Sequence, residues 1–132
     1  VWEARLARLR DHGPDLDAEC AHLLGPRWQG SSSLAPVREM LGRTRPDGWR
    51  GVAAATATAD FFQTTASLTL PTLILAGADD RKTPPDLQRE LADLIAGSRF
   101  QLLRGGSHLS MLTQPEAFAE SVQDFLAAIG HF

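Results

Sequence analysis

Residues 71–84 read PTLILAGADDRKTP, and this stretch indicates the fold class. It begins with a proline and a continuous apolar run that ends at Gly77. Such a run is typical of a strand that is buried on both faces, as in a parallel sheet. Thr83 and Asp86 then form a helix-capping signal, with Pro84 at the predicted first helical position. The stretch therefore predicts a strand followed by a helix.

The pattern of strand and helix repeats toward the C-terminus. Residues 99–103 (RFQLL) predict a second short strand, and a loop with the sequence RGGSH follows at 104–108. The helix between the strands has an apolar stripe formed by Leu87, Leu91, Leu94 and Ile95. A capping box at 113–116 predicts the start of a last helix. The order strand, helix, strand, helix predicts a βαβ unit with a closing helix.

Residues before position 66 show helical patterns only. Glycine–proline pairs predict that one helix ends near residue 13 and a second near residue 25. Val37, Met40 and Leu41 mark a third helix, and a capping box at 44–47 predicts a fourth that runs toward Phe62. Short helices with small apolar faces need another surface to bury against.

Composition limits the possible functions. The 132 residues are 43% hydrophobic and 22% charged, which is ordinary for a globular domain. The net charge of −3 gives no electrostatic reason to expect nucleic acid or an anionic membrane as a partner. Cys20 is the single cysteine, which excludes an internal disulfide and favours a reducing, cytoplasmic setting. No apolar run approaches the ~20 residues of a membrane span, and no motif predicts a metal or cofactor.

Two residues with catalytic potential follow the predicted strands. In open α/β sheets, functional groups collect beyond the carboxyl ends of the strands. Asp80 follows the first strand and His108 follows the second, so their side chains could meet at the sheet edge. A carboxylate that orients an imidazole of pKa ~6.5 makes it a competent general base. The alternative is that Asp80 only hydrogen-bonds nearby backbone in its turn.

Two segments resemble those that carry the acid and the histidine of α/β-hydrolases. The first is PTLILAGADDRKTP, and the second is GGSHLS at 105–110, followed by QPEAF and a terminal helix. WEAR at 2–5 and PDGW at 46–49 resemble the cap of 3-oxoadipate enol-lactonases. The resemblance implies an α/β fold in which residues 66–132 are the C-terminal part of an α/β-hydrolase core, with its last two parallel strands and their helices. Residues 1–65 would be a helical cap, or lid.

The resemblance also implies site residues and a substrate class. Asp80 matches the acid of the triad and His108 the base, while Asp79 is a competing acid at a position that varies in the family. Trp28 and Trp49 would line a substrate pocket beneath the cap, or simply pack the cap onto the sheet. The implied reaction is hydrolysis of a carboxylic ester or lactone, with a 3-oxoadipate enol-lactone of aromatic catabolism as the best substrate. Other chemistry of the scaffold is the alternative: esterase, cofactor-free haloperoxidase or C–C hydrolase.

The nucleophile of such an enzyme is missing from the sequence. No G-x-S-x-G occurs, because Leu34 replaces the closing glycine after the serines at 31–33, and Ser107 lies in the wrong type of loop. The chain also begins without Met, which suggests a processed or truncated polypeptide. We therefore expect the serine and the remaining strands to come from an absent N-terminal half, a second chain or a second copy. This chain alone would be inactive, or would act only by association through its exposed sheet edge.

Overall fold

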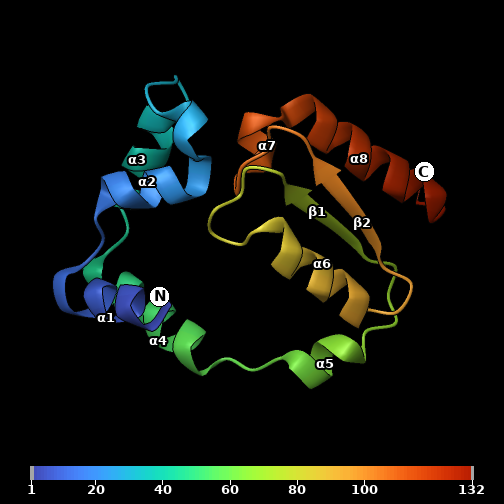
Figure 1. Cartoon of the computed structure of the whole chain (residues 1–132), viewed down its shortest axis with the longest axis horizontal. Coiled ribbons are helices and arrows are strands. Elements are labelled where there is room, and N and C mark those ends of the chain that lie inside the picture. The colour runs from blue at the N-terminus through green and yellow to red at the C-terminus, as the bar shows by residue number, and fades with distance from the viewer. Residues whose placement is uncertain (1, 132) are drawn as a thin grey trace.

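The computed structural model describes residues 2–131, except for the side chains of Trp2 and Arg5. A helical region comes first in the chain. Its elements are α1 (Trp2–His12), α2 (Leu16–Leu24), the short 3-10 helix η1 (Pro26–Trp28), α3 (Leu34–Gly42) and α4 (Pro46–Thr58). Figure 1 shows these helices as one group, set to one side of the strands. The glycine–proline breaks predicted from the sequence are confirmed, since α1 and α2 end just before Gly13 and Gly25.

The helical region has a small apolar core of its own. Asp15 caps α2 by accepting a hydrogen bond of 3.1 Å from the backbone N–H of Ala18. The buried core residues of α2 and α3 are Cys20, Leu23, Leu24, Val37 and Leu41. Each fully buried aliphatic side chain contributes about 1.5–3 kcal/mol to folding. Leu109, from the loop after the second strand, packs against the same cluster and joins this core to the rest of the molecule.

The starts of α4, α6 (Pro85–Leu94) and α8 (Pro115–Ala128) differ from the sequence prediction, and each has a proline in its first turn. The capping boxes predicted at 44–47 and 113–116 do not form, because Arg45 and Gln114 are the N-caps and make no side-chain capping bond. Pro84 was predicted at the first helical position but is the N-cap, and Pro85 occupies the first turn. A residue that precedes proline is disfavoured in the helical conformation, so the helix begins at the proline itself.

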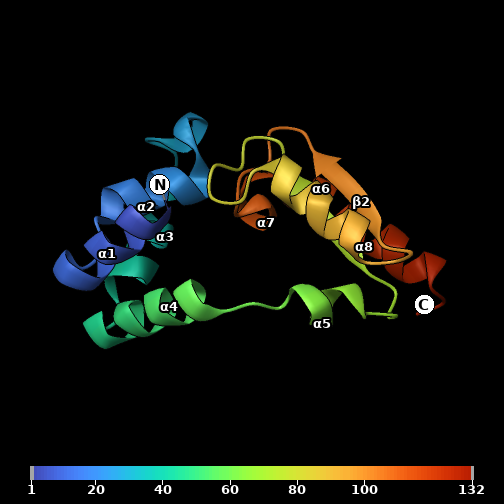
Figure 2. The same cartoon turned by 60° about the horizontal axis from the view of Figure 1, so that its bottom comes forward.

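The predicted fourth helix ends before it reaches Phe62. Helix α4 ends at Thr58, and a separate helix α5 (Phe62–Ala66) follows. Ala59 has an extended backbone, and Asp60 Oδ1 accepts a hydrogen bond of 3.1 Å from the backbone N–H of Phe62. This local Asx turn competes with continued helix and restarts it at Phe62. Figure 2 shows the resulting connector, in green, running from α4 through α5 toward the strands. The predicted boundary near residue 66 stays a prediction.

The C-terminal region is the predicted βαβ unit with its closing helix. Its elements are β1 (Leu73–Gly77), α6 (Pro85–Leu94), β2 (Arg99–Leu103), the short α7 (Ser110–Thr113) and α8 (Pro115–Ala128). The strands β1 and β2 pair in parallel, with Leu73 opposite Arg99 and Gly77 opposite Leu103. Helix α7 was not predicted from the sequence.

Helices α6 and α8 cover opposite faces of the sheet. Alternate residues of β2 face opposite sides. Phe100 packs with Ile74 toward α6, where the guanidinium of Arg89 lies 4.2 Å from the Phe100 ring centre. Gln101 faces α8 and donates a hydrogen bond of 2.7 Å to Ser121 Oγ. The sheet therefore lies between the two helices, as Figure 1 shows.

The sheet has an open edge within residues 2–131. It contains two strands, so β1 is paired on one side only. Leu73 and Leu75, which share one face of β1, are half-buried, although the sequence predicted a strand buried on both faces. Large apolar side chains are also exposed on α4 and the connector, namely Val52, Phe61, Phe62 and Leu70.

The end of β1 approaches the loop at 104–108 closely at Gly77. A Cβ atom at this position would lie 2.6 Å from the carbonyl oxygen of Gly106 and would also collide with that of Ser107. Just beyond it, Ala78 N–H donates to Leu103 O at 2.9 Å, and Asp79 N–H donates to Gly106 O at 2.8 Å. Only glycine permits this contact between the loops.

We expect the substitution Gly77→Ala to destabilise the full-length protein, meaning the natural polypeptide that contains these residues, by about 1–3 kcal/mol. The reason is that the end of β1 and the loop at 104–108 must move apart. The matched control is Gly51→Ala in α4, where a Cβ atom would meet nothing within 4 Å. This control should stabilise the protein by about 0.5–1 kcal/mol. Urea unfolding followed by circular dichroism measures both changes, and a Gly77→Ala protein as stable as wild type would contradict the steric argument.

Candidate active site

Asp80 and His108 are in direct contact. Asp80 lies in the loop after β1 and His108 in the loop after β2, so the parallel strands deliver both to the same edge of the sheet. His108 Nδ1 lies 3.0 Å from Asp80 Oδ2. The side chain of Asp80 is 2% exposed, whereas that of His108 is 28% exposed. The imidazole thus has one nitrogen against a buried carboxylate and remains partly open to solvent.

Several donors surround the Asp80 carboxylate. Oδ1 accepts from the backbone N–H groups of Lys82 at 2.8 Å and Thr83 at 3.0 Å. Oδ2 accepts from Thr83 Oγ1 at 2.9 Å and from Gln88 Nε2 at 3.2 Å. Burial acts to raise the pKa of Asp80, but hydrogen bonds from His108 and Thr83 outweigh it and lower the pKa below its ordinary value. The buried acid is therefore ionised at neutral pH.

The ionised carboxylate determines which nitrogen of the His108 ring carries the hydrogen. A carboxylate can only accept hydrogen bonds, so we assign the ring proton to Nδ1. The other nitrogen, Nε2, then carries a free lone pair. This arrangement lets Nε2 take a proton while Asp80 stabilises the resulting imidazolium.

A second network holds the loop that carries His108. Ser107 is 1% exposed, and its backbone N–H donates to Thr113 Oγ1 at 3.0 Å. Ser107 Oγ accepts a hydrogen bond of 3.1 Å from the backbone N–H of Leu109. A buried hydroxyl with these contacts supports the loop and is not presented to a substrate. The serines at 31–33 follow η1 rather than a strand, so they too lack the strand-to-helix elbow of a nucleophile.

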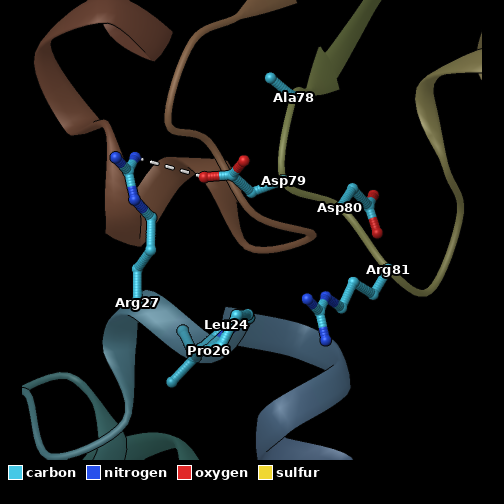
Figure 3. Close-up of a pocket in the computed structure, with 8 residues that line it drawn as sticks. Leu24, Pro26, Arg27, Ala78, Asp79, Asp80 and Arg81 are labelled. Carbon is cyan, nitrogen blue, oxygen red and sulfur yellow. Dashed lines mark hydrogen bonds and ion pairs between the residues drawn. The ribbon is translucent and has the colours of Figure 1, made fainter.

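Asp79 faces a different partner. Its Oδ2 lies 3.3 Å from Arg27 Nη1, and both side chains are exposed. Figure 3 shows the Asp79 carboxylate directed toward Arg27, while that of Asp80 points another way. The competing acid therefore joins the loop after β1 to η1 and does not contact His108 through any hydrogen bond found among the described residues.

A cleft of about 460 Å³ separates the helical region from the loop after β1. Its two walls are formed by residues 24–27 and 78–81 (Figure 3). Trp28 and Trp49 do not line this cleft; both pack against the core of the helical region. Their buried indole N–H groups have no hydrogen-bond partner among residues 2–131. A substrate-binding role for these tryptophans stays a prediction.

Sequence reasoning missed the side chains that surround the acid and base. Thr83 was interpreted only as part of a helix cap, and Gln88 and Thr113 were given no role at the site. The Asp-x-x-Thr spacing from Asp80 to Thr83 was a usable signal, because a threonine three residues after an aspartate can bond back to it. Within the described part of the chain, no group of three or more His, Cys, Asp or Glu side chains could hold a metal ion. None of the helices there is both long and apolar enough to cross a bilayer.

The chain belongs to the alpha/beta hydrolase family, whose sequence model matches residues 1–121. Among solved structures, the enol-lactonase from Burkholderia xenovorans LB400 is 29% identical with a TM-score of 0.84; the match covers 96% of this chain and 50% of that one. This agrees with the fold class predicted from the sequence, the C-terminal part of an α/β-hydrolase.

Curated relatives include more than one kind of hydrolase. 3-Oxoadipate enol-lactonase 1 of Acinetobacter baylyi is 32% identical over 91 residues, which cover 69% of this chain and 34% of the relative. RutD of Pseudomonas savastanoi, named as a carbamate hydrolase, is 35% identical over 74 residues, covering 56% of this chain and 29% of RutD. The chain thus spans half or less of each protein that it resembles here.

The stability contributed by Asp80 should depend on pH. Because folding lowers the pKa of Asp80, its stabilising effect is present above the ordinary carboxyl pKa of about 3.9 and is lost as pH falls through the lower folded value. Asp80→Asn should cost about 1.5–3 kcal/mol at pH 7, since it removes hydrogen bonds to a charged group. The difference from wild type should shrink below about pH 4. Urea unfolding of the full-length protein across this pH range measures it.

The neighbouring substitution Asp79→Asn is the control. It removes one exposed ion pair with Arg27, which is expected to contribute at most about 1 kcal/mol. An Asp80→Asn cost that is equally small, or that does not change with pH, would show that the carboxylate is not stabilised as described.

Proposed function

We propose that this chain supplies the acid and the base of a serine hydrolase that acts on a carboxylic ester or lactone. The observation that carries the proposal is the 3.0 Å contact between His108 Nδ1 and the buried Asp80 carboxylate, at the carboxyl ends of two paired parallel strands. The nucleophilic serine would come from a segment outside this sequence, which contains no G-x-S-x-G. The complete enzyme would thus combine that serine with Asp80 and His108.

The proposed reaction follows from the roles of these groups. His108 Nε2 takes the proton of the serine hydroxyl as the oxygen bonds to the substrate carbonyl carbon. Asp80 holds the imidazolium at Nδ1 through this step. The C–O bond to the leaving alkoxide or enolate then breaks, and His108 returns the proton to it. His108 then takes a proton from water as the water oxygen bonds to the acyl carbon. It returns that proton to the serine oxygen as the acyl–serine bond breaks and the acid leaves.

The preferred substrate is a 3-oxoadipate enol-lactone, which would place the enzyme in aromatic catabolism. Two enol-lactonases support this choice, one by sequence over 69% of the chain and one by structure with a TM-score of 0.84. Carbamate hydrolysis is the second candidate, supported by the 35% identity to RutD. Both reactions attack a carbonyl carbon, so the same acid–base pair would serve either of them.

Turnover by the full-length protein tests the assignment. Asp80→Asn and His108→Ala should each lower kcat by about 10³–10⁴-fold, because the base is lost or wrongly oriented. Asp79→Asn should retain activity within about fivefold. The measurement is hydrolysis of an enol-lactone, an aryl ester and a carbamate by each protein, with near-ultraviolet circular dichroism to verify folding.

The outcomes separate the candidates. Wild-type turnover by His108→Ala would refute the acid–base proposal, and equal losses in the two aspartate variants would extend the acid role to Asp79. A kcat/KM for the carbamate that exceeds that for the lactone would favour carbamate hydrolysis.

The alternative is that this chain has no catalytic role and only associates with another polypeptide. The free edge of β1 and the exposed Phe61, Phe62 and Leu70 would suit pairing with another strand. Native mass spectrometry of the protein from its source should find these residues within a longer chain, or bound to a second one, that contains G-x-S-x-G. If only self-assembled copies of this chain are found, the hydrolase proposal fails and association remains. If the chain is found alone, both proposals fail.

A further inference from the structure

Thr83 contacts both members of the acid–base pair. Its Oγ1 lies 2.9 Å from Asp80 Oδ2 and 3.1 Å from His108 Nδ1, so one hydroxyl bridges the carboxylate and the ring. The carboxylate and the ring nitrogen are themselves 3.0 Å apart. These three atoms form a closed triangle in which every side is a hydrogen-bond distance.

We propose that Thr83 is a positioning residue that keeps the proton of His108 on Nδ1. A hydroxyl has one hydrogen to donate and two lone pairs with which to accept. Asp80 is ionised and only accepts, so the Thr83 hydrogen is directed to Oδ2. Toward His108 the hydroxyl can then offer only a lone pair. Nδ1 therefore faces two acceptors, and only the tautomer with a hydrogen on Nδ1 satisfies both.

The same hydroxyl limits proton transfer to Asp80. Oδ2 already accepts from Thr83 and from Gln88 Nε2 at 3.2 Å, while Oδ1 accepts from two backbone N–H groups. A carboxylate with these donors has little remaining affinity for a proton. The hydrogen shared with His108 thus stays on the ring, which leaves Nε2 as the proton acceptor of the proposed reaction.

The Thr83 hydroxyl has no structural task in the adjoining helix. The sequence suggested that it caps α6, but Pro84 is the N-cap and no side chain makes a capping bond there. The backbone of Thr83 makes turn contacts that Thr83→Val retains: its N–H donates to Asp80 Oδ1 at 3.0 Å and its carbonyl accepts from Gln88 Nε2 at 2.8 Å. Removing the hydroxyl should therefore affect the ring more than the fold.

The test compares Thr83→Val, which is isosteric but has no hydroxyl, with Thr83→Ser, which retains it, in the full-length protein. Thr83→Val should lower kcat about tenfold, the effect of one hydrogen bond to a charged group, and change KM by less than about twofold. Thr83→Ser should stay within about threefold of wild type. Thr56→Val is the matched control, because the Thr56 hydroxyl donates only to the backbone oxygen of Val52 on exposed α4.

Histidine nitrogen NMR provides a readout that does not depend on turnover. Wild type should show His108 with its hydrogen on Nδ1, and Thr83→Val should show a larger fraction of the Nε2 tautomer, because Nδ1 then faces only Asp80 as an acceptor. A wild-type ring that carries its hydrogen on Nε2 overturns the proposal even if Thr83→Val does not fold. So does a Thr83→Val protein with an unchanged tautomer and wild-type kcat.

This inference rests on the proposed acid–base pair, but the two fail in different ways. If His108→Ala leaves hydrolysis intact, the proposed function fails, while the tautomer measurement still decides whether Thr83 orients the ring. If His108→Ala abolishes hydrolysis and Thr83→Val leaves both kcat and the tautomer unchanged, only the role of Thr83 is lost.

Discussion

The contact between the end of β1 and the loop at 104–108 controls the geometry of the site. The register of the parallel strands places Gly77 opposite Leu103. Because Gly77 has no Cβ, the backbone beyond β1 and the loop at 104–108 can meet just beyond that pair. Two backbone hydrogen bonds then join the loops, from Ala78 N–H to Leu103 O and from Asp79 N–H to Gly106 O. Asp80 is the next residue, so its 3.0 Å contact with His108 depends on this close approach.

The buried acid also depends on its own turn. Desolvation disfavours a charged Asp80, and the hydrogen bonds to its two oxygens reverse that preference. Most of these donors lie within eight residues of Asp80 along the chain, so the turn that places the carboxylate also keeps it ionised. The helical region reaches both loops as well, since Leu109 N–H donates to Leu23 O at 3.3 Å and Arg27 pairs with Asp79.

The sequence predicted what depends on local pattern. The strand–helix order and the meeting of Asp80 with His108 followed from apolar runs and from the common edge at which parallel strands end. Helix starts were predicted less well, because the helices begin at prolines and the predicted capping boxes do not form. The role of Thr83 was beyond sequence reasoning, since its hydroxyl contacts a ring 25 positions away, and that separation is closed only by the tertiary approach at Gly77.

The open edge of β1 restricts how the site could be completed. In a parallel sheet the carboxyl ends of all strands lie at the same end of the sheet, and Asp80 and His108 lie at that end. A segment that pairs with β1 in parallel would direct its carboxyl end, and any elbow that follows it, toward Asp80 and His108. A segment paired antiparallel would direct its carboxyl end to the opposite end of the sheet, beyond reach of His108 Nε2. The direction of strand pairing, more than the affinity of association, therefore decides whether a partner segment could bring a serine to this acid and base.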